Sequence, residues 1–301
     1  MTPTKTLLLL AKTRSYKKTV LYSGDATKIC DLTLDSKWIW TSKVNSASSL
    51  VAAGNQGGQI TVYPLKFNDV FSFSNDRYVC RQNMTDIVIK HVKTNQTTII
   101  RGKDFIKDIS TYNKKFALQL SSEMICTYEE CDQDGSFQYQ IKEKISHVSC
   151  SMLPLTSNHL ILCDEYSLSI LTFTENVVRT TQFESKISCV RTIECPQSFE
   201  YILIGFDDGF TKKIIIDKSF PVDVLKHSRE MRFLDLNWDL SKIGFIDSMD
   251  NFFVKDLKTK DELLFEKEVT CFAFNNDICD TVCFAKRDGT LVVRSNFSLF
   301  I

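Results

Sequence analysis

Short apolar segments recur along the chain at a nearly constant spacing. When Ile109, Cys150, Val190, Leu234 and Phe272 are aligned as equivalent positions, the successive steps are 41, 40, 44 and 38 residues. The segments that carry them span 105–110, 147–152, 187–193, 231–236 and 269–274. A period of about 40 residues is typical of four-stranded β-propeller blades, in which each blade buries its faces only against its neighbours. The pattern therefore predicts an all-β chain built for binding and assembly rather than catalysis.

Each repeat continues with a hairpin of two apolar strands. Turn-forming residues separate the paired strands: Gly57–Gly58 within 49–65, Asp208–Gly209 within 201–216, Asp288–Gly289 within 281–294, and Ser248–Asn251 within 242–257. Glycine tolerates the positive φ of a tight turn, and Asp and Asn are turn formers in their own right. The last strands of the repeats, within 136–144, 177–183 and 260–268, are more polar, which is expected of outer strands whose edges face water.

The spacing changes in the N-terminal part of the chain. Residues 37–44 open a blade whose hairpin closes at residue 65, but the next regular opening strand starts at 105. The segment 67–102 has room for a crossover and about three strands. This break predicts two domains: residues 1–65 as the last blade or blades of a first WD40-like propeller, and residues 66–301 as a second, incomplete WD40-like propeller that lacks its final blade. The Gly-His and Trp-Asp signatures of regular WD40 repeats are missing, so these blades are divergent.

Composition and charge narrow the class of protein. The 301 residues are 43% hydrophobic, and 37 Lys and Arg balance 37 Asp and Glu, for a formal net charge of zero. Whole-chain charge therefore predicts neither a nucleic-acid-binding protein nor a polybasic membrane protein. The locally basic stretch 4–18 is interpreted as a solvated surface, with a lipid- or RNA-binding arm as the alternative. No segment approaches the ~18 apolar residues of a membrane-spanning helix, and no secretory signal is recognisable, so we expect a cytosolic protein.

Eleven cysteines, an odd number without a Cys-x-x-Cys pair, require an interpretation. Most of them lie inside apolar strand patterns, as Cys126, Cys163, Cys189 and Cys283 do. A free cysteine behaves as a small buried hydrophobe, and a cytosolic protein keeps its thiols reduced. We therefore expect reduced thiols in the core.

No group of residues has the spacing of a metal site. The histidines are isolated in the sequence: His91, His147, His159 and His227. Cys271, Cys279 and Cys283 with Asp280 could form a thiolate cluster, but Cys271 and Cys283 have apolar strand neighbours and no further ligand is evident. These cysteines are interpreted as core residues, so we expect no metal.

The sequence also lacks the motifs of common active sites. Gly-x-Gly-x-x-Gly, Walker A and Gly-x-Ser-x-Gly motifs are all missing, and nothing places a nucleophile beside a base. We therefore expect no catalytic residue, no cofactor and no enzymatic activity. Asp86 and Asp108 are candidate blade-stabilising acids. Trp38 and Trp40 lie on one face of a strand, where packing is the expected role and a recognition surface is the alternative.

Several strings resemble consecutive parts of the intraflagellar transport protein 122 family. They span 38–65, 76–92, 106–120, 139–145, 234–266 and 269–285, in the order and spacing of that family. The most specific are "NMTDIVIKHV" (83–92) and "KTKDELLF" (258–265), because blade packing alone does not require those residues. The resemblance covers the chain from about residue 30 to its C-terminus.

This resemblance implies a non-enzymatic scaffold subunit of intraflagellar transport complex A. It implies roles in retrograde ciliary transport and in the ciliary entry of membrane receptors, at the cilium or flagellum, the basal body and the cytoplasm. The implied partners are other complex A subunits, with a tubby-like cargo adaptor and ciliary membrane receptors as further candidates. The family also carries a helical solenoid, which this chain lacks, so the chain is expected to be a partial one. A coatomer-like or other vesicle-traffic propeller and a propeller substrate receptor of a ubiquitin ligase remain the alternatives.

Overall fold

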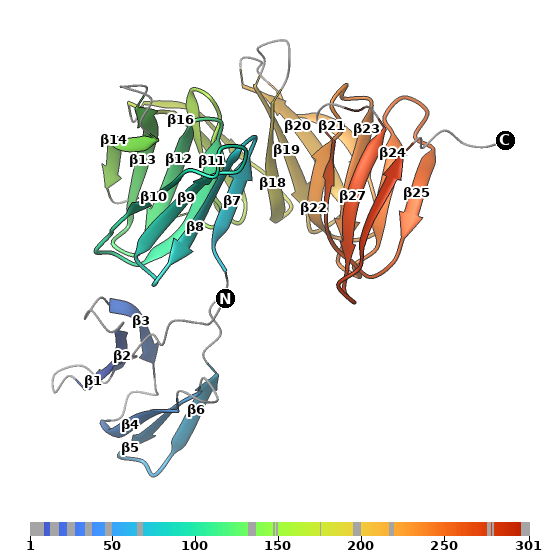
Figure 1. Cartoon of the computed structure of the whole chain (residues 1–301). Coiled ribbons are helices and arrows are strands. Elements are labelled where there is room, and N and C mark those ends of the chain that lie inside the picture. The colour runs from blue at the N-terminus through green and yellow to red at the C-terminus, as the bar shows by residue number, and fades with distance from the viewer. Residues whose placement is uncertain are drawn as a thin grey trace. The chain divides into compact units, whose positions relative to one another are not determined.

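A computed structural model shows an all-β chain of antiparallel sheets (Figure 1). The structure describes residues 9–12, 18–22, 28–33, 38–45, 50–64, 69–131, 137–146, 148, 150–174, 176–194, 200–216, 220–275, 278 and 280–295. Within these ranges it contains 28 strands in eight sheets. Among the same residues, no helix has the length and apolar character needed to cross a membrane.

The strands follow one another along the chain, three or four to a sheet. The first four sheets are formed by β1 (Leu9–Lys12), β2 (Lys18–Tyr22) and β3 (Lys28–Thr33); β4 (Ile39–Asn45), β5 (Leu50–Asn55) and β6 (Ile60–Pro64); β7 (Phe71–Ser74), β8 (Arg77–Gln82), β9 (Asp86–His91) and β10 (Thr97–Ile100); and β11 (Ile106–Tyr112), β12 (Lys115–Leu120), β13 (Met124–Cys131) and β14 (Gln138–Ser146). The other four are formed by β15 (His159–Cys163), β16 (Ser167–Thr172) and β17 (Val177–Gln182); β18 (Ile187–Glu194), β19 (Glu200–Phe206), β20 (Phe210–Ile215) and β21 (Val222–Lys226); β22 (Met231–Leu236), β23 (Lys242–Asp247), β24 (Phe252–Asp256) and β25 (Glu262–Glu266); and β26 (Val269–Phe274), β27 (Thr281–Lys286) and β28 (Leu291–Ser295).

Each sheet has the strand order of a propeller blade. Consecutive strands pair in chain order, and the opening strands of successive sheets contact one another: β7 with β11, β18 with β22, and β22 with β26. The opening strand is bulged at the same place in five sheets, between Ile39 and Thr41, Ile106 and Asp108, Ile187 and Cys189, Met231 and Phe233, and Val269 and Cys271. A bulge bends the strand and re-aims the side chains that follow it. The predicted fold of divergent WD40-like blades is confirmed.

The chain forms two compact units, Met1–Ser149 and Cys150–Ile301. Each unit has its own cores, made where one sheet packs on the next. In the first unit, apolar residues of β8 and β9 pack against β11–β13. In the second, separate clusters join β15 and β16 to β18–β20, β18 and β19 to β22–β24, and β23 and β24 to β26 and β27. This division separates compact units, whereas the predicted boundary at residue 65 separates two propellers. The predicted boundary therefore stays a prediction.

Asparagine and aspartate make many of the turns that glycine makes in more regular repeats. Asn75, Asn83, Asn95 and Asn113 all have positive φ, between 49° and 58°. Asparagine tolerates this left-handed conformation better than other residues with a Cβ, because its short side chain can bond to the local backbone. The ten glycines of the sequence are therefore enough for the fold.

Two predictions about strands are wrong. Residues 71–100 form four strands, β7–β10, where the sequence indicated about three. The predicted opening strand at 147–152 is not a continuous strand in its described part, which has only isolated bridges from Met152 to Cys163 and from Leu155 to Leu160. Pro154 lies between the bridges and has no N–H to donate to a ladder, which explains the interruption. The outer strand predicted within 260–268, by contrast, is confirmed, because β25 spans Glu262–Glu266.

Candidate functional site

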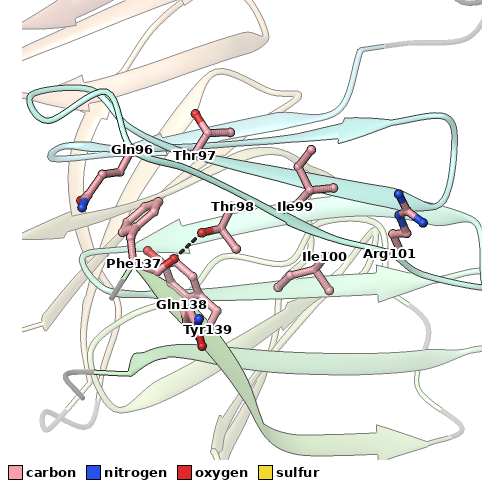
Figure 2. Close-up of a pocket in the computed structure, with 9 residues that line it drawn as sticks. All are labelled: Gln96, Thr97, Thr98, Ile99, Ile100, Arg101, Phe137, Gln138 and Tyr139. Atoms are coloured by element: carbon pink, nitrogen blue, oxygen red, sulfur yellow. Dashed lines mark hydrogen bonds between the residues drawn. The ribbon is translucent and has the colours of Figure 1, made fainter. Parts of the chain in front are cut away.

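A groove of about 730 Å³ lies between the outer strands β10 and β14 (Figure 2). One wall is formed by residues 96–101, which include all of β10. The other wall is formed by Phe137, Gln138 and Tyr139, at the start of β14. Arg101 is the only charged residue among the nine that line the groove. The lining thus combines neutral polar groups with apolar surface, which suits a polypeptide better than a highly charged ligand.

The two walls of the groove are held in place by side-chain contacts. Thr98 Oγ1 donates a hydrogen bond to the carbonyl oxygen of Phe137 (Figure 2). The rings of Phe137 and Tyr139 meet edge to face, with centroids 5.5 Å apart. Tyr139 Oη donates to Glu130 Oε2 at 3.1 Å, and Arg77 Nη2 donates to the same oxygen at 2.8 Å. Burial, reinforced by Glu130, raises the pKa of Tyr139, so its hydroxyl stays protonated and keeps this donor role.

Among the residues that the structure describes, no strand pairs with β10 on the side away from β9. The N–H of His91 donates to the carbonyl of Gln96 at 2.9 Å, so these two residues form a hydrogen-bonded pair between β9 and β10. Because such pairs alternate with non-bonded ones in an antiparallel ladder, the N–H and C=O groups of Thr97 and Ile99 point away from β9. An extended polypeptide could pair with these groups and pack on the neighbouring aromatic rings.

A second concentration of polar side chains surrounds Asp247, at the end of β23. The Asp247 side chain is 0% exposed, yet it accepts hydrogen bonds from the backbone N–H groups of Met249 and Asn251, each at 2.9 Å. Asn251 Nδ2 donates at 3.0 Å and Arg229 Nη1 at 3.3 Å, while His227 Nε2 lies 3.6 Å away. We refer to these five residues as the Asp247 cluster. It joins the β23–β24 turn to the segment that leads into β22.

Charged pairs extend from this cluster to the next sheet. Asp250, in the same turn, pairs with Arg232 on β22 and with Arg287, which follows β27. Lys286 Nζ donates to Glu266 Oε2 at 2.8 Å, between β27 and β25. Arg232 and Arg287 are more than half exposed, so these pairs contribute modestly to stability and mainly orient the turns.

Protonation of Asp247 is expected to destabilise the second unit at low pH. Burial alone would raise the pKa of this carboxyl, but hydrogen bonds from Asn251, Met249 and Arg229 favour the charged form and hold its pKa below the ordinary 3.8. A carboxyl whose pKa is lower in the folded chain gives stability that is complete above its unfolded pKa and is lost as the pH falls through the folded value. The free energy of unfolding should therefore decrease below about pH 4.

The measurement is a series of urea unfolding curves at pH values from neutral to acidic, on the wild type and on Asp247→Asn. The variant keeps the shape of the side chain but has no carboxyl to protonate, so it should be less stable at neutral pH and should lose less stability on acidification. Parallel profiles for the two proteins would contradict this role of Asp247.

Glu200 organises a comparable polar cluster at the start of β19. Its carboxylate accepts hydrogen bonds from Thr156 Oγ1 at 2.9 Å, from the N–H of Asn158 at 3.2 Å and from Ser157 Oγ, and it lies 2.8 Å from His159 Nδ1. Burial opposes ionisation, but the bonds from Ser157, His159 and Thr156 prevail and lower the pKa of Glu200. The cluster ties the loop before β15 to the next sheet, which is a structural role.

Two of the four histidines thus have acidic partners that are distant in the sequence. His159 pairs with Glu200 and His227 lies beside Asp247, whereas the His91 ring packs edge to face on Phe137. Burial lowers the pKa of His227, so its ring is neutral near pH 7. His147 lies outside the described residues. Over the described part of the chain, no group of three or more His, Cys, Asp and Glu residues could hold a metal ion.

Of the eight cysteines whose side chains the structure describes, two are buried in the core, five are half-buried and one is exposed. Cys126 and Cys163 are buried, and Cys189 and Cys283 are half-buried. Burial raises the pKa of Cys189 to about 12 and also raises the pKa of Cys163, so neither thiol ionises at neutral pH to become a nucleophile.

The imagined thiolate cluster separates into unlike residues. Cys271 is exposed, so its assignment to the core is wrong: its neighbour Phe272 is buried, and successive side chains of a strand point to opposite faces. Cys283 is half-buried on β27, and Cys279 lies outside the described residues. Asp280 forms an ion pair with Lys242. The prediction that the chain has no catalytic, cofactor or metal residues stays a prediction.

The candidate acids and tryptophans have separate outcomes. Asp108 Oδ1 accepts a hydrogen bond from the N–H of Ile109 at 2.8 Å, and Asp86 Oδ1 lies 3.4 Å from Thr85 Oγ1.

The expected packing role of Trp38 and Trp40 is wrong, because their exposed fractions are 59% and 66%. The bulge in β4 puts Ile39 in the core and leaves both indole rings outside, which leaves the recognition role open.

Neither the groove nor the Asp247 cluster was found by reasoning from the sequence. The groove depends on side chains from two sheets, for which local periodicity carries no signal. The Asp247 cluster did have a signal: Asp247 directly precedes a turn, and His227 precedes the opening strand of the same repeat. Comparing such positions across repeats could have paired the two residues.

Comparison with known families identifies one family model that matches most of the chain. A family model described as the IFT122 second beta-propeller matches residues 71–300. The curated relatives include proteins named intraflagellar transport protein 122 homolog from Homo sapiens, Danio rerio and Xenopus tropicalis, which are 33%, 31% and 32% identical over 273, 272 and 285 residues. These alignments cover 90%, 90% and 94% of this chain but only 22%, 23% and 24% of the relatives.

Solved structures agree on the fold. The Cps50 (Swd1) beta-propeller domain of Myceliophteria thermophila has a TM-score of 0.57 at 10% identity, over 87% of this chain and 97% of that domain. The computationally designed Ika8 protein has a TM-score of 0.54 at 13% identity, over 98% of each chain. Identities this low support the fold alone. The match of the family model over most of the chain supports more: the chain belongs to the family of IFT122 second β-propellers.

Proposed function

We propose that this chain is a non-enzymatic scaffold segment of intraflagellar transport complex A and acts through protein–protein contacts. The observation that carries the proposal is the match of the IFT122 family model to residues 71–300, together with the identity of about one third to curated relatives. The polar clusters around Asp247 and Glu200 agree with it, because their hydrogen bonds hold loops and turns rather than poise a reactive group. The chain spans about a quarter of the length of those relatives.

The finer roles follow from the family. They are retrograde ciliary transport and the ciliary entry of membrane receptors, at the cilium or flagellum and its basal body as well as in the cytoplasm. The partners are other complex A subunits, with a tubby-like cargo adaptor and membrane receptors as further candidates. Full-length tagged chain should recover complex A subunits from ciliated cells, identified by mass spectrometry. Recovery of vesicle-coat or cullin-adaptor proteins instead would overturn the proposal.

The groove between β10 and β14 is the candidate surface for one such contact. The outward N–H and C=O groups of Thr97 and Ile99 can bond to an extended segment of a partner subunit, and Phe137 and Tyr139 supply rings for its side chains. Arg101, at one end of the lining, favours a segment with a carboxylate there.

Replacing Thr97 with proline is expected to weaken this contact. Proline removes the outward N–H of Thr97 but spares the bonds between β9 and β10, since proline is tolerated on a strand edge that faces solvent. One lost hydrogen bond corresponds to about tenfold weaker binding. Thr97→Ala, which keeps the N–H, is the matched control. Recovery of the partner subunits by each variant is measured by quantitative mass spectrometry, with thermal unfolding as a check on the fold.

The two parts of the proposal fail separately. If wild-type chain recovers no complex A subunit, the scaffold function is wrong. If wild type and Thr97→Pro recover the same subunits in equal amount, the scaffold function holds and the groove is not its contact surface.

A further inference from the structure

The aromatic wall of the groove between β10 and β14 continues directly from the core of the first unit. The ring of Phe116 stacks on that of Tyr128 with centroids 4.7 Å apart, and the ring of Tyr139 lies 5.3 Å from Phe116. Phe137 follows at 5.5 Å from Tyr139, and His91 follows at 5.7 Å from Phe137. Phe116 and Tyr128 are buried, whereas Phe137 and Tyr139 are half-buried and line the groove. Packing against the core therefore holds this wall in one position.

An ion pair between the two sheets fixes the width of the groove. Arg77 Nε and Nη2 donate to Glu130 Oε2 at 3.0 and 2.8 Å, and the two side chains are only 13% and 12% exposed. Glu130 also accepts the hydrogen bond from Tyr139, its cross-strand partner on β14. Arg77 belongs to the sheet that provides β10, and Glu130 and Tyr139 belong to the sheet that provides the aromatic wall. Both walls are thus in place before a ligand binds, which reduces the entropy lost on binding.

The edge of β10 is the outer edge of its sheet. The strand order is β10-β9-β8-β7, and the opening strand β7 contacts β11 of the next sheet. Propeller blades join through their faces, so a further blade would leave this outer edge as it is. On another outer strand, β21, Lys260 Nζ donates to the carbonyl of Val224 at 2.8 Å, and lysine at an edge opposes pairing with another strand. Within the described part of the chain, no side chain bonds in this way to the outward carbonyls of Thr97 and Ile99.

The side chains of β10 point alternately toward the aromatic wall and away from it. Thr98 bonds to the carbonyl of Phe137, and Ile100 packs on the core that includes the wall (Figure 2). Thr97 and Ile99 therefore point to the opposite side. A strand added at this edge would bond to the backbone of Thr97 and Ile99, and its own side chains would alternate in the same register. Its residues opposite Thr98 and Ile100 would then enter the groove.

We propose that the groove selects an extended segment of a partner subunit that adds to β10 as a strand and carries two apolar side chains at alternate positions. These side chains pack on Phe137 and Tyr139, and the residue between them points away from the wall. Arg101 directly follows Ile100 and is the only charged residue of the lining, so the segment carries a carboxylate at that end. The inference rests on the scaffold function proposed above, to which it adds the class of segment that binds.

The walls of the groove discriminate against other kinds of segment. An apolar side chain gains free energy by leaving water for the rings of Phe137 and Tyr139. A charged side chain at the same position would lose its hydration beside these rings without gaining an ionic partner. A helix bonds its backbone groups internally, so it could not pair with the N–H and C=O groups of Thr97 and Ile99. Backbone pairing thus requires an extended segment, and the aromatic wall requires apolar residues at every second position.

The first step of the test identifies the segment by photo-cross-linking. The full chain carries p-benzoylphenylalanine in place of Ile99, which is 56% exposed and points away from the aromatic wall. After irradiation in ciliated cells, mass spectrometry locates the partner residues that are joined to position 99. We expect them to lie in one extended segment with apolar residues at alternate positions.

The second step measures which residues of that segment carry the affinity. A fluorescein-labelled peptide of the cross-linked segment is titrated with the full wild-type chain, and its anisotropy is followed. Serine at either position that faces the wall should weaken binding by at least about tenfold, and serine at the residue between them by less than about threefold. Phe137→Ser in the chain should also weaken binding by at least about tenfold. Phe265→Ser, which removes an exposed ring from another outer strand, should bind as wild type does.

The outcomes separate this inference from the scaffold function. If the wild-type chain recovers no complex A subunit, the scaffold function is wrong and the inference fails with it. If complex A subunits are recovered but position 99 cross-links to nothing, to a helix or to a second copy of this chain, the inference alone is wrong. Equal effects of serine at all three peptide positions would also overturn it. The peptide series leaves the chain unchanged, so it decides the question even if Phe137→Ser does not fold.

Discussion

Replacing Phe252 with alanine is expected to lower the free energy of unfolding of the second unit by about 3–5 kcal/mol. The Phe252 side chain is 0% exposed, and its ring centroid lies 4.6 Å from that of Phe272 and 5.5 Å from that of Phe284. Removing the ring loses the free energy of transferring it from water to the core, and it leaves a cavity between two sheets. The sheets cannot close this cavity fully, because the hydrogen bonds within each sheet hold its strands in register.

Differential scanning calorimetry of the full chain measures this effect. A loss of that size in a unit of about 150 residues corresponds to a fall in Tm of roughly 10 °C. Phe265→Ala is the matched control, since Phe265 lies on the next strand of the same sheet but is 43% exposed. Its loss should cost about 1 kcal/mol or less. Equal effects of the two substitutions would show that the interface between β24 and β26 does not stabilise the unit.

The sequence pattern carries most of the information about the strands and little about their irregularities. The apolar repeat at Ile109, Val190, Leu234 and Phe272 predicts opening strands because each of these strands must bury a face against a neighbouring blade. It fails at Cys150, whose apolar neighbours resemble an opening strand although Pro154 interrupts the ladder beyond them. A pattern of side chains reports burial, whereas backbone pairing also depends on where an N–H is missing.

Register and bulges decide the exposure of individual residues, and neither is visible in local periodicity. Trp38 and Trp40 alternate as core residues would, yet both are exposed because the strand buries Ile39 instead. Cys271 lies among apolar residues but is turned outward beside a bulge. A shift of one residue moves a whole strand's side chains to the other face, so single-residue exposure cannot be read from composition.

The polar clusters show a similar limit for the candidate site. Asp247 could be recognised as a turn former, but its buried contact with Arg229 and its proximity to His227 require the blade to be folded. The groove along β10 is even harder to predict from the sequence, because Phe137 contributes to it from another sheet. Strings such as "NMTDIVIKHV" carry the resemblance to the family because blade packing alone does not require those residues, and the match of the family model to residues 71–300 confirms it.

Replacing Gly209 with alanine is expected to cost more than the same change at the other positive-φ glycines. Gly209 has a φ of 82°, and a Cβ there would lie 2.2 Å from the carbonyl oxygen of His227 and 2.7 Å from that of Arg229. Left-handed backbone costs a residue with a Cβ about 1–2 kcal/mol, and the overlap with two carbonyl groups adds about 1–3 kcal/mol because backbone cannot rotate away as a side chain would. The N–H of His227 also donates to the carbonyl of Gly209 at 2.9 Å, which fixes the approach of the two segments.

Gly289 and Gly58 provide the controls that separate these two costs. Their φ values are 86° and 76°, but nothing lies within 4 Å of an added Cβ at either position. Gly289→Ala and Gly58→Ala should therefore show only the conformational cost of about 1–2 kcal/mol, and Gly209→Ala should lose roughly twice as much, measured by urea unfolding of the three variants and the wild type. If all three variants lose the same stability, the prediction is wrong. The segment from His227 to Arg229 would then be able to move away from Gly209, although the hydrogen bond from the N–H of His227 indicates that it is held there.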